Sequence, residues 1–197
     1  MSARAIRRVT SSIVVTLVLA GCSRSAGVAD EAPPPAPRGT ERAQCTAADP
    51  EGELILHPRS LTVAEDTTLV DVALLDAVNL SIVEQAVTGF TGNPEVQGVI
   101  RDYPPLKTAG LVDSLADWDQ RRPLSGLALT ATDGQQAVLV ALRLDDPTLS
   151  GRLVGVTLTS EVAGTVLTQE IEQPVLVQPP GAVCTFDDVD ATREWVP

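Results

Sequence analysis

The sequence predicts an all-β fold, a two-sheet antiparallel β-sandwich, from three observations. Apolar residues recur at every second position after about residue 53, as in Val78, Leu80 and Ile82. Glycine, proline, asparagine and aspartate separate these runs at short intervals, as they do in turns between strands. About 140 residues are available to the globular part, which is enough for one core and therefore one domain.

Nine segments fit this pattern in chain order. In one of the clearest, Val154, Val156 and Leu158 alternate with small or polar residues. Ala163-Gly164 lies between two such runs and predicts a two-residue hairpin turn. The predicted strands are 53–57, 60–64, 67–75, 77–88, 125–132, 136–145, 152–162, 165–171 and 174–178.

This succession of short strands resembles the immunoglobulin-like class of β-sandwich. The tryptophan that such domains usually pack against a buried disulfide between the sheets has no counterpart here. The resemblance therefore implies a two-sheet sandwich and leaves the order of its strands open.

A long connector, 89–124, interrupts the strands. It has 36 residues, far more than a hairpin loop, and it contains Phe90, Tyr103 and Trp118, three of the five aromatic residues of the chain. Long connections in compact domains are typically functional or disordered. Apolar residues at helical spacing predict a short helix over 110–120, namely Leu111, Val112, Leu115, Ala116 and Trp118.

The first 22 residues resemble the signal region of bacterial lipoproteins, which ends in a lipobox. A basic start is followed by an apolar stretch, 9–19, that is too short for a permanent membrane anchor, and then by Leu19-Ala20-Gly21-Cys22. The resemblance implies cleavage before Cys22 and attachment of a lipid, with acyl chains such as palmitate, to the cysteine sulfur. The alternative is an ordinary cleaved secretory signal in which Cys22 is incidental.

The chain then divides into four expected parts. A lipoprotein signal peptide covers 1–21, and a disordered tether rich in proline and alanine covers 22–44. The β-sandwich domain covers 45–185, and an acidic C-terminal tail covers 186–197. The tether would hold the domain away from the bilayer, although a proline-rich segment can also be a recognition ligand.

With Cys22 lipidated, Cys45 and Cys184 are the remaining cysteines, one at each end of the domain. In an oxidising compartment such a pair is expected to form a disulfide. In the chain-entropy model a loop of this length would stabilise the fold by roughly 5 kcal/mol. A role for the pair as metal ligands or as a redox centre lacks a neighbouring cysteine or histidine at ligand spacing.

The charge of the chain limits its partners. The net charge is −12, and cleavage before Cys22 would remove Arg4, Arg7 and Arg8 and leave a mature chain at −15. Nucleic acid would repel such a chain, so no nucleic-acid partner is expected. Proteins, neutral ligands and cations remain as partner classes.

The sequence offers no constellation that predicts catalysis, and no cofactor is expected. Its single histidine, His57, precedes a proline at a predicted strand end and fits an ordinary structural position. Two acidic clusters supply the oxygen ligands that calcium prefers, but neither has EF-hand spacing, and a solvated charged surface is the favoured explanation for each. The clusters are Asp113, Asp117 and Asp119, which Arg121-Arg122 could pair with, and Asp187, Asp188 and Asp190.

Two aromatic residues of the connector, Tyr103 and Trp118, form with Asp117 and Asp119 a candidate recognition patch. Aromatic side chains flanked by charge are favoured at the centres of protein interfaces. The alternative is that the two rings fold inward and close one open end of the sandwich.

These observations predict a lipoprotein at the extracytoplasmic face of the cell membrane, anchored through Cys22. The expected role is a non-catalytic binding or scaffolding module for another protein of the cell envelope. One alternative is an accessory subunit of an envelope transporter or cell-wall enzyme. Another is a metal-dependent enzyme that uses the acidic clusters.

Overall fold

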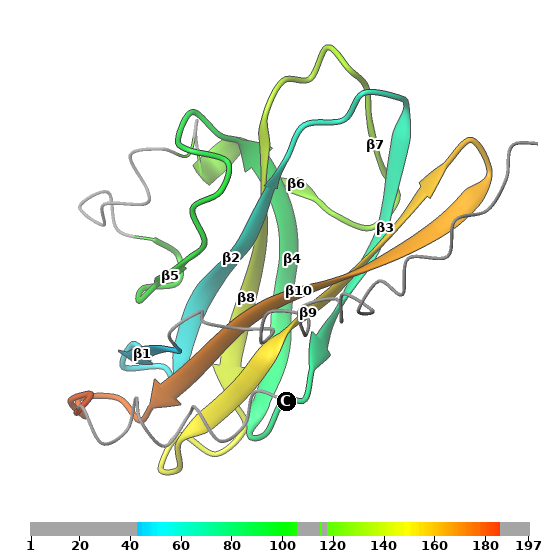
Figure 1. Cartoon of the computed structure of the whole chain (residues 1–197). Coiled ribbons are helices and arrows are strands. Elements are labelled where there is room, and N and C mark those ends of the chain that lie inside the picture. The colour runs from blue at the N-terminus through cyan, green and yellow to red at the C-terminus, as the bar shows by residue number, and fades with distance from the viewer. Residues whose placement is uncertain (1–42, 106–114, 116–117, 186–197) are drawn as a thin grey trace, which may run out of the picture. The chain divides into compact units, whose positions relative to one another are not determined.

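A computed structural model describes residues 43–105, 115 and 118–185, and it bears out the all-β, two-sheet prediction (Figure 1). Within these residues no helix is long and apolar enough to cross a membrane. The strands are β1 (Gln44–Ala47), β2 (Glu53–Leu61), β3 (Thr67–Leu75), β4 (Leu80–Gly89), β5 (Gly98–Ile100), β6 (Arg122–Pro123), β7 (Leu127–Leu129), β8 (Gln136–Leu144), β9 (Gly151–Val162) and β10 (Thr165–Gln178).

The strands form two sheets of five. The first sheet has the order β1-β10-β9-β3-β7, and the second sheet has the order β5-β2-β8-β4-β6. Every neighbouring pair is antiparallel except β1 and β10, which run parallel. The two-residue hairpin turn is also confirmed, because Val162 pairs with Thr165 and both turn residues between them have positive φ angles.

Two prolines explain where the predicted strands differ from the observed ones. The sequence suggested a strand end at Pro58 and another near Pro174, but β2 and β10 continue through these positions. Proline cannot donate a backbone hydrogen bond to a strand ladder, so it is tolerated at a bulge. The register of β2 shifts between Leu56 and Arg59, and that of β10 shifts between Glu172 and Val175.

The expected helix over 110–120 corresponds, within the described residues, to a single 3-10 turn at Trp118–Gln120. Residues 110–114 and 116–117 lie outside the described part of the chain. Two short parts of the connector form edge strands: β5 pairs with β2, and β6 pairs with β4. These strands, like β1, have only two to four residues each, which is too few for an alternating pattern to appear in the sequence.

The main core lies between the two sheets. It is made by the inward side chains of the long strands, which alternate with outward ones as the period of a strand requires. On β8 the inward residues are Val138, Val140, Leu142 and Leu144, and opposite them the first sheet contributes Leu69, Val72, Leu153, Val156, Leu158, Ile171, Val175 and Val177.

A second, smaller core lies on the other face of the second sheet. The outward residues of β8 are apolar too, and with Ile55 of β2 they pack against residues of the connector. The members of this outer core are Ile55, Ala137, Leu139 and Ala141 from the sheet and Phe90, Ile100 and Leu115 from the connector, with Tyr103 and Trp118 at its margin. Strand β8 is therefore buried on both faces, and the connector forms a third layer.

Candidate functional site

A disulfide joins the two ends of the domain, as predicted. Cys45 lies in β1 and Cys184 follows β10, and their Cα atoms are 5.9 Å apart. Cys45 is also paired with Leu176 across the parallel β1–β10 ladder. The covalent bond and the ladder together hold a strand of only four residues at the edge of the first sheet.

Several predicted site residues lie outside the described residues, and no position is given to them. They include the lipidation site Cys22, the patch residue Asp117, and the acidic residues Asp113, Asp187, Asp188 and Asp190. Within the part of the chain that is described, no three histidine, cysteine, aspartate or glutamate side chains are grouped to hold a metal ion.

The predicted patch residues Tyr103 and Trp118 do come together. Their rings meet edge to face with centroids 6.1 Å apart, and both rings are half-buried against the outer core. Asp119 is exposed beside them. Edge-to-face packing is a favourable arrangement for aromatic pairs. Because both rings pack against the outer core, they help to cover the outer face of the second sheet.

Glu84 and Arg121 contact the two aromatic residues Tyr103 and Trp118, and neither was predicted to do so. The Nε of Arg121 donates to Oε1 of Glu84 at 2.8 Å, and the hydroxyl of Tyr103 donates to Oε2 of the same carboxylate. The guanidinium of Arg121 lies over the Trp118 ring, 4.4 Å from its centroid. Arg121 thus reaches β4, which is 37 positions away in the chain, whereas Asp113 and Asp117, with which it could also pair, lie outside the described residues. We name Tyr103, Trp118, Arg121 and Glu84 the connector cluster.

The electrostatics of the connector cluster fit a structural role, in which Arg121 and Tyr103 attach the connector to Glu84 of β4. Desolvation by burial raises the pKa of Glu84, but hydrogen bonds from Arg121 and Tyr103 outweigh it and hold that pKa below its usual value. Burial, and then the hydrogen bond to Glu84, raise the pKa of the Tyr103 phenol. The carboxylate is therefore ionised and the phenol protonated at neutral pH, as their hydrogen bond requires.

His57 is a further residue whose setting the sequence did not reveal. It was expected at a strand end, but it lies inside β2 at the bulge, fully buried on the side of the outer core. Its ring packs against Phe90 with centroids 5.0 Å apart, and its Nε2 is 3.2 Å from the hydroxyl of Ser60. Its Nδ1 is buried and has no hydrogen-bond partner among the described residues. Desolvation by burial lowers the pKa of His57 from 6.5 to about 4, so the imidazole is neutral at neutral pH.

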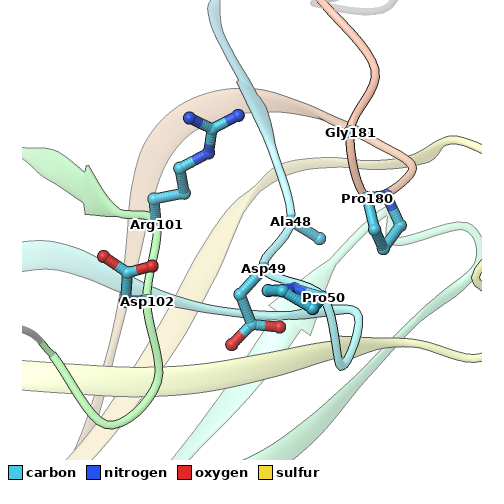
Figure 2. Close-up of a pocket in the computed structure, with 7 residues that line it drawn as sticks. All are labelled: Ala48, Asp49, Pro50, Arg101, Asp102, Pro180 and Gly181. Atoms are coloured by element: carbon cyan, nitrogen blue, oxygen red, sulfur yellow. The ribbon is translucent and has the colours of Figure 1, made fainter.

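A hollow of about 530 Å³ lies where the segments that follow β1, β5 and β10 meet (Figure 2). Its one buried carboxylate belongs to Asp49. The Oδ1 of Asp49 accepts hydrogen bonds from the backbone amides of Glu51 and Glu53, and its Oδ2 accepts one from the amide of Tyr103. The lining residues are Ala48, Asp49, Pro50, Arg101, Asp102, Pro180 and Gly181.

The partners of Asp49 define its role. Three backbone amides donate hydrogen bonds to this carboxylate, so its orientation is set by the main chain. Figure 2 shows the guanidinium of Arg101 extending away from this carboxylate. Asp49 therefore fastens the part of the connector that follows β5 to the turn between β1 and β2.

No protein-family model matches the sequence, and no curated protein matches it.

Proposed function

We propose that the chain is a lipid-anchored lipoprotein at the extracytoplasmic face of the cell membrane, and that its β-domain binds or scaffolds another envelope protein. The observation that supports this most is the Cys45–Cys184 disulfide. Structural disulfides persist in oxidising compartments and are rare in the cytosol. The lipobox ending at Cys22 supports the same location from an independent part of the sequence.

We also propose that the domain is of the immunoglobulin-like type, and the strand order supports this. The six long strands follow one another in the chain as β2, β3, β4, β8, β9 and β10. If they are lettered B to G, one sheet contains B-E-D and the other G-F-C, which is the arrangement in immunoglobulin-like domains. The place of strand A beside B is taken by β5, from the connector, and β1 lies parallel beside G.

The surroundings of two side chains with lowered pKa values, His57 and Glu84, support binding rather than catalysis. The His57 imidazole is sealed inside the outer core, and the Glu84 carboxylate is bonded to Arg121 and Tyr103. A general base needs access to the proton that it removes. These groups are instead used to attach the connector to the second sheet.

The anchor is tested by replacing Cys22 with alanine in the full-length chain and fractionating the cells. Because the thioether forms on that cysteine, the Cys22→Ala protein should be released from membranes or remain unprocessed, whereas Ser23→Ala should behave as the unaltered chain. A Cys22→Ala protein that is processed and bound to membranes as before would overturn the proposed anchor.

Partner binding is tested by cross-linking in intact cells, followed by purification from the membrane fraction. A specific envelope protein should be joined to the chain. An accessory subunit would be recovered with a transporter or a cell-wall enzyme, which distinguishes that alternative. A chain that cross-links to no protein would overturn the proposed binding role.

A further inference from the structure

The strand β10 is paired along only part of its outer edge. One edge pairs with β9 from Thr165 to Val177, but β1 covers the other edge only from Val175 to Gln178. Figure 1 shows the turn end of this hairpin, in orange, at the periphery of the domain. Within the described residues, no strand pairs with the outer edge over 165–172.

The hairpin turn determines which backbone groups face this open edge. In a two-residue turn the flanking residues, here Val162 and Thr165, form a hydrogen-bonded pair. Because hydrogen-bonded and non-bonded pairs alternate in an antiparallel ladder, the backbone groups of Val166, Thr168 and Glu170 point away from β9. Six amide and carbonyl groups are thus directed outward.

An observed contact agrees with this assignment. Glu172 is two residues after Glu170 in the same continuous register, so its backbone carbonyl should also point away from β9. That carbonyl accepts a hydrogen bond from the Nε2 of Gln97 at 3.3 Å. The connector therefore closes the edge at Glu172, and the open edge, as we name it, is the segment 165–171.

The side chains along the open edge are apolar and acidic. Residues 165–170 are all exposed, with Val166 and Leu167 at 62% and 49%. On the face that carries Val166, the acidic side chains are Glu170 and Glu161, the latter being directly opposite Val166 on β9. No lysine or arginine occurs in the hairpin between 153 and 178.

We propose that the open edge receives an extended segment of a partner protein, which adds a strand to the first sheet and carries basic and apolar side chains. Strand addition would satisfy the outward amides and carbonyls, and it is an established mode of peptide recognition. A basic side chain opposite Glu170 would form a favourable cross-strand pair, and apolar side chains would cover Val166 and Leu167. The proposal rests on the proposed binding function, for which it names the surface and the partner chemistry.

The charge of this chain argues against a second copy as the occupant. Two open edges would bring together two strands whose charged side chains are all acidic, on chains that each carry a net charge of −12. Like charges directly opposite each other destabilise a strand pair. The negative electrostatic potential that repels a second copy attracts a basic segment and favours its binding.

The test uses Thr168, whose amide points outward. Proline at this position removes that amide without removing a hydrogen bond to β9, so Thr168→Pro should fold normally and prevent strand addition. Thr168→Val retains the amide and is the matched control. The probes are two synthetic peptides, one of four Lys-Val repeats and one of four Glu-Val repeats, added to the full-length chain in detergent micelles.

Amide hydrogen exchange, followed by nuclear magnetic resonance, gives the readout. In the free chain the amides of Val166, Thr168 and Glu170 should exchange rapidly, and the Lys-Val peptide should slow them. Thr168→Pro should weaken binding of this peptide about tenfold or more, which corresponds to about 1.4 kcal/mol, whereas Thr168→Val should change it by less than about twofold. Glu170→Lys should weaken binding too, and Glu95→Lys, at an exposed site in the connector, should not.

Three outcomes would overturn the proposal. The first is that the Lys-Val peptide leaves all three amides unprotected, and the second is that the Glu-Val peptide binds equally well. The third is that the amides are already protected in the free chain, by its own termini or by a second copy. Cross-linking in cells separates this proposal from the proposed function: a partner captured equally by Thr168→Pro and the unaltered chain would refute the open edge alone, whereas capture of no partner would refute the binding function.

Discussion

Gly155 of β9 lies against the backbone carbonyl oxygen of Ile171 in β10, so close that a Cβ on Gly155 would overlap that oxygen. The same Cβ would be 3.0 Å from the Cα of Glu172 and 3.1 Å from the backbone nitrogen of Gln173. All three contacts are with backbone, which cannot move aside as a flexible side chain can. The register of β10 shifts directly after Glu172, so a residue without a side chain is required where the bulge approaches β9.

Replacing Gly155 with alanine should therefore destabilise the fold. The overlap forces the two strands apart, and overpacking of this kind typically costs about 1–3 kcal/mol of unfolding free energy. The measurement is the urea midpoint followed by tryptophan fluorescence. Thr157→Ala, two residues away on the same strand, is the control and should change the free energy by less than about 0.5 kcal/mol. An unchanged midpoint in Gly155→Ala would show that the close contact is not rigid.

The disulfide should contribute a large part of the stability of the domain. A Cys45→Ser, Cys184→Ser double variant should lose about 2–5 kcal/mol of unfolding free energy, because the unfolded chain is no longer constrained and β1 is held only by its short parallel ladder. Denaturant unfolding checks this loss. Alkylation and mass spectrometry of the native chain provide an independent check, since Cys45 and Cys184 should both resist alkylation until a reductant is added. Free thiols at both positions in the native chain would refute the bond.

The fold class could be predicted because apolar residues alternate with other residues along a strand. The turn-forming residues that separate strands are also visible in a short stretch of sequence. The same local signals predicted a strand end near Pro58 and another near Pro174. In the structure β2 and β10 stay paired with their neighbours on both sides of these prolines, and the register shifts at a bulge. On β8, Leu139 and Ala141 alternate with the inward valines and are apolar as well. Their apolar character was the available signal for a strand buried on both faces.

The disulfide could be predicted from the number and position of the cysteines, but the connector cluster could not be predicted in full. Tyr103 and Trp118 were recognisable as aromatic residues in a long connector. Their partner Glu84 is a single acidic residue on a predicted strand, and its relation to Arg121 depends on how β4 and the connector are placed in space. A pair that is separated by 37 positions leaves no local pattern in one sequence.

His57 should make the stability of the domain depend on pH in the mildly acidic range. Its pKa is about 4 in the folded state, below its ordinary value of 6.5, because burial disfavours the charged ring. Between these two values the unfolded state binds a proton that the folded state does not bind. The unfolding free energy should therefore fall as the pH decreases from 6.5 to about 4, by up to about 3 kcal/mol in total, and should be unaffected by this group above pH 6.5.

A His57→Gln variant isolates this contribution. Glutamine retains a polar group near Ser60 but does not titrate, so its unfolding free energy should vary less between pH 7 and pH 4.5 than that of the unaltered chain. Carboxylates such as Glu84 also titrate at low pH, but they are common to both proteins and cancel in the difference. Equal pH dependence in the two proteins would mean that His57 is protonated without cost in the folded state.

Trp118 separates the two interpretations of the connector cluster, and the expected result of Trp118→Ala is a loss of stability. Its half-buried ring packs against Tyr103 and lies under Arg121, so its removal should cost about 1–3 kcal/mol, less than the 3–5 kcal/mol typical of a fully buried aromatic residue. Trp118→Phe, which retains an aromatic surface, should recover most of this loss. Denaturant midpoints and partner capture in membranes are measured on the same two variants. Capture should be unchanged if the ring only covers the outer core. A loss of capture equivalent to about 2 kcal/mol with little loss of stability would instead identify Trp118 as an interface anchor, and would make the recognition patch, rather than the open edge, the principal binding surface.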